Sequence, residues 1–98
     1  MSNTIHFKPD VDLTFKSVVA VRAKLYTALM DANSTIFCLD LNDVTHCDSA
    51  GLALLIEAKK LCKQNNKIFE VSGMSAKTQS LAEFCGVASI LETDQIVN

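Results

Sequence analysis

Proline, glycine and tryptophan are scarce in this chain of 98 residues, which has one Pro, three Gly and no Trp. No linker, low-complexity tract or internal repeat interrupts it, so we expect one domain over residues 1–98. Neither sign of charge dominates, because nine Lys and Arg stand against eleven acidic residues and the net charge is −2. This balance argues against a nucleic-acid-binding module. With 49% hydrophobic residues, disorder is not expected either.

The chain also lacks the apolar runs that membrane insertion and secretion require. No stretch approaches the roughly 18 apolar residues of a transmembrane helix. Residues 1–10 carry polar side chains where a signal peptide would be apolar. We therefore expect a cytoplasmic protein whose four cysteines are free, buried thiols; they are Cys38, Cys47, Cys62 and Cys85.

Motifs for metal, nucleotide or catalytic chemistry are missing as well. No two Cys or His have the spacing of a structural zinc site, and no glycine-rich loop with a lysine is present. We predict no metal and no cofactor. His46 with Cys47 or Ser49 offers a base and a nucleophile, but the Gly-x-Ser-x-Gly turn is absent and neighbouring side chains usually point apart. We therefore expect no catalytic residue and no enzyme activity.

The apolar residues that are present follow two different spacings. Short runs rich in β-branched and aromatic residues predict strands over residues 4–7, 35–41 and 67–72. Apolar residues three and four apart predict amphipathic helices over residues 14–30, 48–64 and 75–84. This alternation indicates an α/β fold, with a mixed or mostly parallel sheet of about four strands and helices on at least one face.

Two local features refine this prediction. The run 35–41 does not alternate between apolar and polar residues, which predicts a central strand covered on both faces. Val11 and Leu13 are a candidate for a further short strand. Asn33 is a candidate left-handed cap after the first helix, and Asn65 with Asn66 is expected to end the second.

The segment 39–55 holds the candidate functional residues. Asp48 and Ser49 stand where a helix leaves its first amides unpaired, and both residue types are good caps. The same helix end favours negative charge, so a phosphate on Ser49 could be accommodated there. Simple capping is the alternative interpretation. At about 100° per residue, one flank outside the core stripe suggests a docking patch, unless the N-terminal segment covers it. That flank carries Leu52, Ile56, Lys59 and Lys63.

Residues 48–52, with the sequence DSAGL, follow the strand-like Leu39-Asp40-Leu41 and resemble the signature of STAS domains. These are the sulfate-transporter and anti-sigma-antagonist domains. The resemblance covers about residues 35–91. The N-terminal third matches weakly, because the family's Gly-acidic-Leu strand end appears as residues 11–13 (VDL) without the glycine. The resemblance implies a single small STAS-like domain.

Within the family, residues 49–55 (SAGLALL) and the basic helix after them are similar to the MlaB-like subgroup. That likeness implies a non-catalytic subunit that regulates the ATPase of a phospholipid-transport ABC transporter and reaches the inner membrane only through this partner. Ser49 would contact the ATPase. Further partner-binding residues would be Asp48, Ala50, Leu52, Ile56, Lys59 and Lys63. The other subgroup, anti-sigma factor antagonists, would make Ser49 the phosphoacceptor of an anti-sigma serine kinase.

Overall fold

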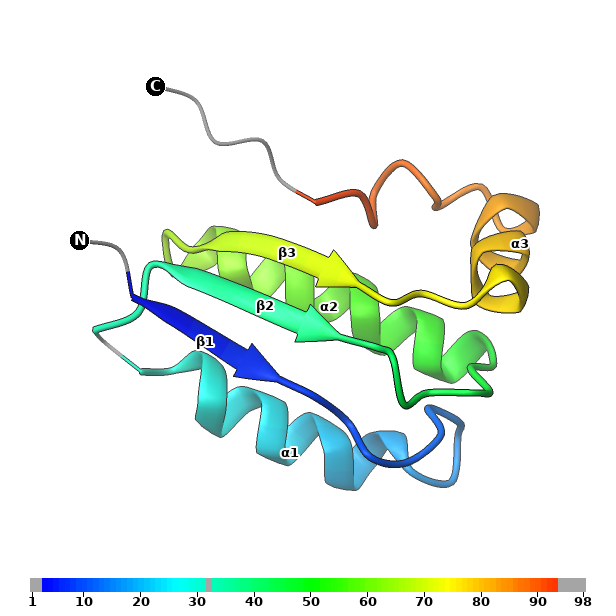
Figure 1. Cartoon of the computed structure of the whole chain (residues 1–98), viewed down its shortest axis with the longest axis horizontal. Coiled ribbons are helices and arrows are strands. Elements are labelled where there is room, and N and C mark those ends of the chain that lie inside the picture. Colours follow the sequence, from blue (N-terminus) through cyan, green and yellow to red (C-terminus); the bar gives the residue numbers. More distant parts are fainter. Residues whose placement is uncertain (1–2, 32, 94–98) are drawn as a thin grey trace.

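A computed structural model describes residues 3–31 and 33–93. Strands and helices alternate along this part of the chain, as the apolar spacing predicts, and the α/β class is confirmed (Figure 1). The elements are β1 (Thr4–Phe7), α1 (Val18–Leu29), β2 (Ile36–Asp40), α2 (Ser49–Gln64), β3 (Ile68–Ser72) and α3 (Ala76–Phe84).

The strands form one parallel sheet in the order β1-β2-β3. About four strands were expected, and the described residues form three. The candidate strand at Val11 and Leu13 is reduced to an isolated bridge between Leu13 and Cys47. Pro9 precedes it, and because proline has no backbone N–H it cannot continue the ladder from β1.

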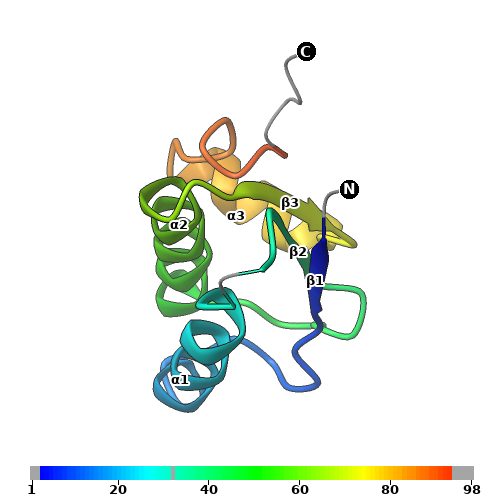
Figure 2. The same cartoon turned by 90° about the vertical axis from the view of Figure 1, so that its left-hand side faces the viewer.

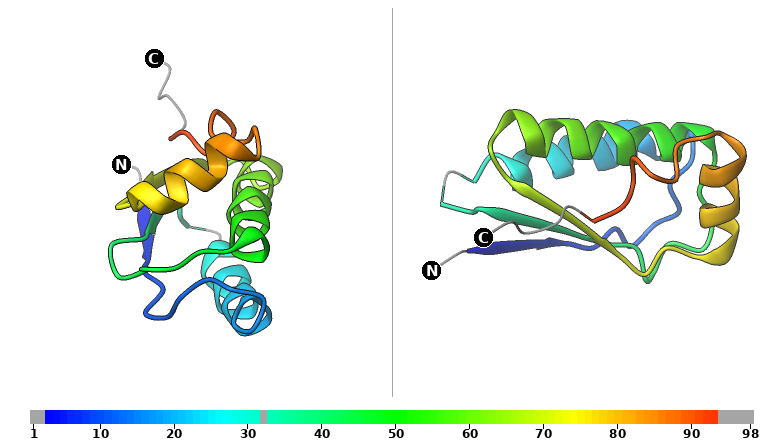
Figure 3. Two further views of the ribbon diagram at one scale, coloured as in Figure 1. Left: turned by 90° about the vertical axis from the view of Figure 1, so that its right-hand side faces the viewer. Right: turned by 90° about the horizontal axis from the view of Figure 1, so that it is seen from above.

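Helices α1 and α2 lie side by side on one face of the sheet (Figures 2 and 3). The register places Phe37 beside Phe69, and both are fully buried beneath the helices. Side chains alternate along a strand, so Cys38 faces the opposite side, where it is only half-buried. Within the described residues no helix covers that side, and the prediction that residues 35–41 are covered on both faces is wrong.

The helix ends agree with the sequence in most places. Asn66 adopts a left-handed conformation (φ 57°) and ends α2 as expected. The Ser75 hydroxyl accepts a hydrogen bond from the first turn of α3, and Gly86 (φ 75°) follows the end of that helix. The expectation for Asn33 is wrong, because α1 ends at Leu29 and its C-cap is Met30, three residues before Asn33.

The cysteines differ in their surroundings. Cys62 is buried, Cys38 and Cys47 are half-buried, and Cys85 is exposed. The predicted burial is therefore wrong for Cys85, because α3 ends at Phe84 and Cys85 lies at its C-cap. No helix in the described part of the chain is long and apolar enough to cross a membrane.

Candidate functional site

Asp48 fixes the N-terminus of α2. Its Oδ1 accepts a hydrogen bond from the Gly51 amide and its Oδ2 accepts one from the Phe15 amide, each 3.0 Å long. These bonds, with that from Gly51 the strongest cause, hold the pKa of the Asp48 carboxyl below its ordinary value. The carboxylate therefore caps α2 and ties it to the turn that precedes α1.

Gly51 allows a close backbone approach behind this cap. The Leu13 carbonyl accepts the Asp48 amide at 3.0 Å, and the Leu13 amide donates to the His46 carbonyl at 2.9 Å. A Cβ added at Gly51 would lie 2.1 Å from the Leu13 carbonyl oxygen. Only glycine fits here, so the glycine of the DSAGL signature has a structural role.

Asp12 positions the loop that leads into the site, and sequence reasoning did not single it out. Its Oδ1 accepts hydrogen bonds from the Thr45 hydroxyl at 2.9 Å, the His46 amide at 3.1 Å and the Thr45 amide at 3.2 Å. The Thr45 hydroxyl is the main reason that the pKa of Asp12 is lowered. The sequence did hold one signal for Asp12: it is the acidic residue of the VDL segment (residues 11–13), which weakly matches the Gly-acidic-Leu strand end of STAS domains.

Ser49 is the first residue of α2 and is exposed. Its hydroxyl makes no hydrogen bond to the residues that the structure describes. Residues three to four apart share a helix side, so Ala53 and Ile56 follow Ser49 along the solvent-facing side, Ala53 exposed and Ile56 half-buried. The hydroxyl thus stands at the end of a small apolar strip.

Two exposed apolar residues from the α1 region extend this strip, and sequence reasoning missed both. Phe15 is 70% exposed and its amide is bound by Asp48, while Val19 is 79% exposed. Val19 also lines a groove of about 130 Å³ between the helices, together with Ala50 and Ala53. We call the six residues the Ser49 surface: Phe15, Val19, Ser49, Ala50, Ala53 and Ile56.

Polar side chains border this surface. Arg22 of α1 and Glu57 of α2 form an ion pair of 2.6 Å across the same groove. Both remain partly exposed, so the pair contributes little to stability. An apolar centre with a charged rim is the usual composition of a protein interface.

Four of the predicted contact residues do not join this surface. Asp48 lies beside it, with both carboxylate oxygens bound by the Gly51 and Phe15 amides. Leu52 is only 3% exposed and belongs to the core, so its prediction as a surface contact is wrong. Lys59 lies two turns after Leu52 and hence on the same side of α2. There its ammonium donates to the Glu92 carbonyl at 3.0 Å. The segment after α3, rather than the N-terminal segment, covers this flank. Lys63 is exposed near the far end of α2.

The Cys47 thiol, which was weighed as a nucleophile, is not activated. Burial, helped by the Asp48 carboxylate, raises the pKa of the Cys47 thiol to about 11, so it is protonated at neutral pH. Within residues 3–31 and 33–93, no group of three or more His, Cys, Asp or Glu is placed to hold a metal ion.

Comparison with known proteins shows which solved structures and which family this fold resembles. Seven chains among the solved structures match. One is a sulfate transporter family protein from Wolinella succinogenes, with a TM-score of 0.73 and 20% identity over 90% of this chain and 70% of that one. At this identity the likeness shows the fold alone.

A search of curated proteins found no significant match. The family model described as "Mlab, STAS domain" matches residues 10–92. The chain therefore belongs to the STAS domain family, whose domains are in general regulatory modules.

Proposed function

We propose that this protein is a cytoplasmic regulatory subunit that binds the ATPase of a phospholipid-transport ABC transporter through the Ser49 surface. The description of the matching family supports this subgroup. One observation carries the proposal: a hydroxyl without a described partner stands on a fixed helix end beside exposed Phe15 and Val19. On this proposal the protein lies at the inner face of the inner membrane through its partner.

The exposed apolar side chains give this surface its binding energy. Fully burying a Val or Phe side chain contributes roughly 1.5–3 kcal/mol, and Phe15 and Val19 are the large exposed apolar residues of the Ser49 surface. Ser49, Ala50 and Ala53 are small, so a partner can approach the backbone of α2 closely. An aspartate at position 49 would add volume and an unpaired charge that the partner would have to desolvate.

The alternative is an anti-sigma factor antagonist that a serine kinase switches at Ser49. The exposed hydroxyl at a helix N-terminus favours it, because the helix dipole stabilises negative charge there. A phosphate of about −1.5 to −2 charge would also stand beside the Asp48 carboxylate and repel it. That conflict would make phosphorylation a strong perturbation of the cap and of any bound partner.

Purification from the protein's own cells separates the two proposals. The chromosomally tagged chain is recovered as wild type, as Ser49→Asp and as Gln64→Glu, and its partners are identified by mass spectrometry. Gln64 lies at the opposite end of α2 and is exposed, so Gln64→Glu is a matched added charge. We expect an ABC ATPase with the wild type and the control, and none with Ser49→Asp. A serine kinase, with one phosphate located on Ser49 of the wild type, would support the alternative instead.

A further inference from the structure

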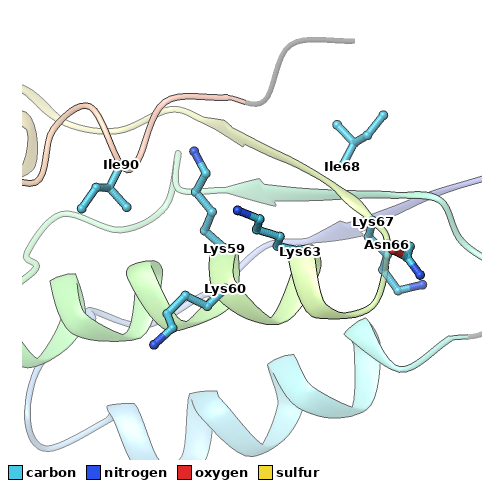
Figure 4. Close-up of a pocket in the computed structure, with 7 residues that line it drawn as sticks. All are labelled: Lys59, Lys60, Lys63, Asn66, Lys67, Ile68 and Ile90. Atoms are coloured by element: carbon cyan, nitrogen blue, oxygen red, sulfur yellow. The ribbon is translucent and has the colours of Figure 1, made fainter. Parts of the chain in front are cut away.

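A cavity of about 610 Å³ lies at the other end of α2, between that helix, the start of β3 and the segment after α3 (Figure 4). Its volume is within the roughly 300–1,000 Å³ that is typical of ligand sites. Lys63 lies 14 residues after Ser49, which is roughly 20 Å along the helix. The cavity therefore lies at the far end of α2 from Ser49, and an inference about it does not rest on the proposed function.

The charged groups of this cavity are all of one sign. Lys59, Lys60 and Lys63 line it together with Lys67, and among residues 3–31 and 33–93 no acidic side chain does. In the described part of the chain, neither Lys60 nor Lys63 forms an ion pair. Figure 4 shows Lys59 and Lys63 projecting between α2 and the segment that carries Ile90, whereas Lys60 turns outward at the rim.

Lys67 differs from the other three lysines because its ammonium is already hydrogen-bonded within the protein. It is buried, and its ammonium donates to the Asp31 carbonyl at 2.7 Å, the Ser34 carbonyl at 2.8 Å and the Ser34 hydroxyl at 2.7 Å. These bonds join the start of β3 to the chain before β2. Lys67 therefore builds the wall of the cavity and is not counted among the groups that meet a ligand.

Three of the last four carbonyls of α2, which would otherwise repel an anion, accept hydrogen bonds; they belong to Leu61, Cys62 and Lys63. The Leu61 carbonyl accepts from the Asn65 side chain at 2.8 Å, and the Cys62 carbonyl accepts from the Lys67 amide at 2.8 Å. A helix C-terminus carries a partial negative charge because such carbonyls lack partners. Here these bonds and the lysines nearby reduce that charge.

Besides the lysines and Asn66, the wall is formed by two isoleucines. Ile68 is half-buried at the start of β3, and Ile90 is 43% exposed in the segment after α3. The lysine stems add methylene groups beside them. We propose that this cavity binds one molecule of an anionic amphiphile, such as an alkyl phosphate or a fatty acid. Its charged head pairs with Lys63, and its chain lies against Ile90 and the start of β3.

Calorimetric titration of the full chain with dodecyl phosphate, kept below its micelle concentration, tests this proposal. The variants are Lys63→Gln, Ile90→Ser and the control Lys77→Gln, which removes an exposed lysine of α3 outside the cavity. We expect saturable one-to-one binding to wild type and control. We expect roughly threefold to tenfold weaker binding to Lys63→Gln, the effect of losing one charge-assisted contact. Ile90→Ser should weaken dodecyl phosphate binding as well. Each variant is first checked for an unchanged unfolding temperature.

Three further arms identify the source of the affinity. Dodecyltrimethylammonium binding as tightly as dodecyl phosphate would overturn the role of the lysines. Inorganic phosphate binding as tightly would overturn the role of the apolar wall. Lysine-dependent flotation with phosphatidylglycerol vesicles, without binding of monomeric dodecyl phosphate, would mean that the surface meets a bilayer and not a single amphiphile.

Discussion

The close contact at Gly51 gives a prediction whose size follows from the structure. In Gly51→Ala the new Cβ would lie 2.1 Å from the Leu13 carbonyl oxygen and 2.8 Å from the Cys47 Sγ. The Leu13 carbonyl is backbone held by the Asp48 amide, so it cannot rotate away as a side chain would. Relief requires that the bridge between Leu13 and Cys47 open.

The expected cost combines three effects. Opening the bridge loses two backbone hydrogen bonds of roughly 1 kcal/mol each, and forcing extra volume beside fully buried Leu13 costs roughly 1–3 kcal/mol. The higher helix preference of alanine than of glycine offsets about 1 kcal/mol of this loss of stability. We therefore expect Gly51→Ala to lower the free energy of unfolding by about 2–4 kcal/mol.

Urea unfolding followed by circular dichroism measures this change. The matched control is Ala53→Gly on the exposed side of the same helix, which isolates the helix preference and should cost about 0.5–1 kcal/mol. If Gly51→Ala instead stabilised the protein by about as much as Ala53→Gly destabilises it, the close approach to Leu13 would be refuted.

Three further predictions follow from single groups. The pKa of Asp12 lies below its ordinary 3.8, so its stabilisation is present above that pH and is lost as the pH falls through the lowered pKa. Urea unfolding of Asp12→Asn should thus differ from wild type at neutral pH and converge with it in acid; a constant difference would contradict this. Lys67→Met removes the ammonium that donates to the carbonyl and hydroxyl of buried Ser34, so the free energy of unfolding should fall by roughly 2–4 kcal/mol in the same assay. A fall below about 1 kcal/mol would count against the role of these bonds. Iodoacetamide at pH 8 should modify exposed Cys85 well before Cys47, whose pKa is about 11, and mass mapping that found equal rates would contradict the assigned burial.

The elements of the fold could be predicted because each depends on nearby residues. The apolar spacing located α2, β3 and α3 to within about a residue at each end, a precision that local periodicity supports. The start of α1 was predicted at residue 14 and lies at Val18. There the Ser17 hydroxyl donates a hydrogen bond to the Asp12 carbonyl and accepts one from the Thr14 amide. These two bonds hold residues 14–17 in a turn.

The composition of the site could be predicted only in part, because its other members come from distant positions. The helix angle gave the side on which Leu52 lies, but whether that side is covered depends on a segment some thirty or more residues further along, which contacts Lys59 through Glu92. Asp12 and Phe15 reach the site through bonds across 33 residues. No local pattern reports such contacts.

The central claim is that the Ser49 surface binds an ABC ATPase. The most direct test is the dissociation constant between that purified ATPase and the wild type, Ser49→Asp or Gln64→Glu, with each variant first shown to unfold as the wild type does. We expect wild type and Gln64→Glu to bind alike, and Ser49→Asp to bind at least roughly tenfold more weakly, the effect of an unpaired charge in an interface. Equal affinity of Ser49→Asp and wild type, or no binding by any of the three, would contradict the account.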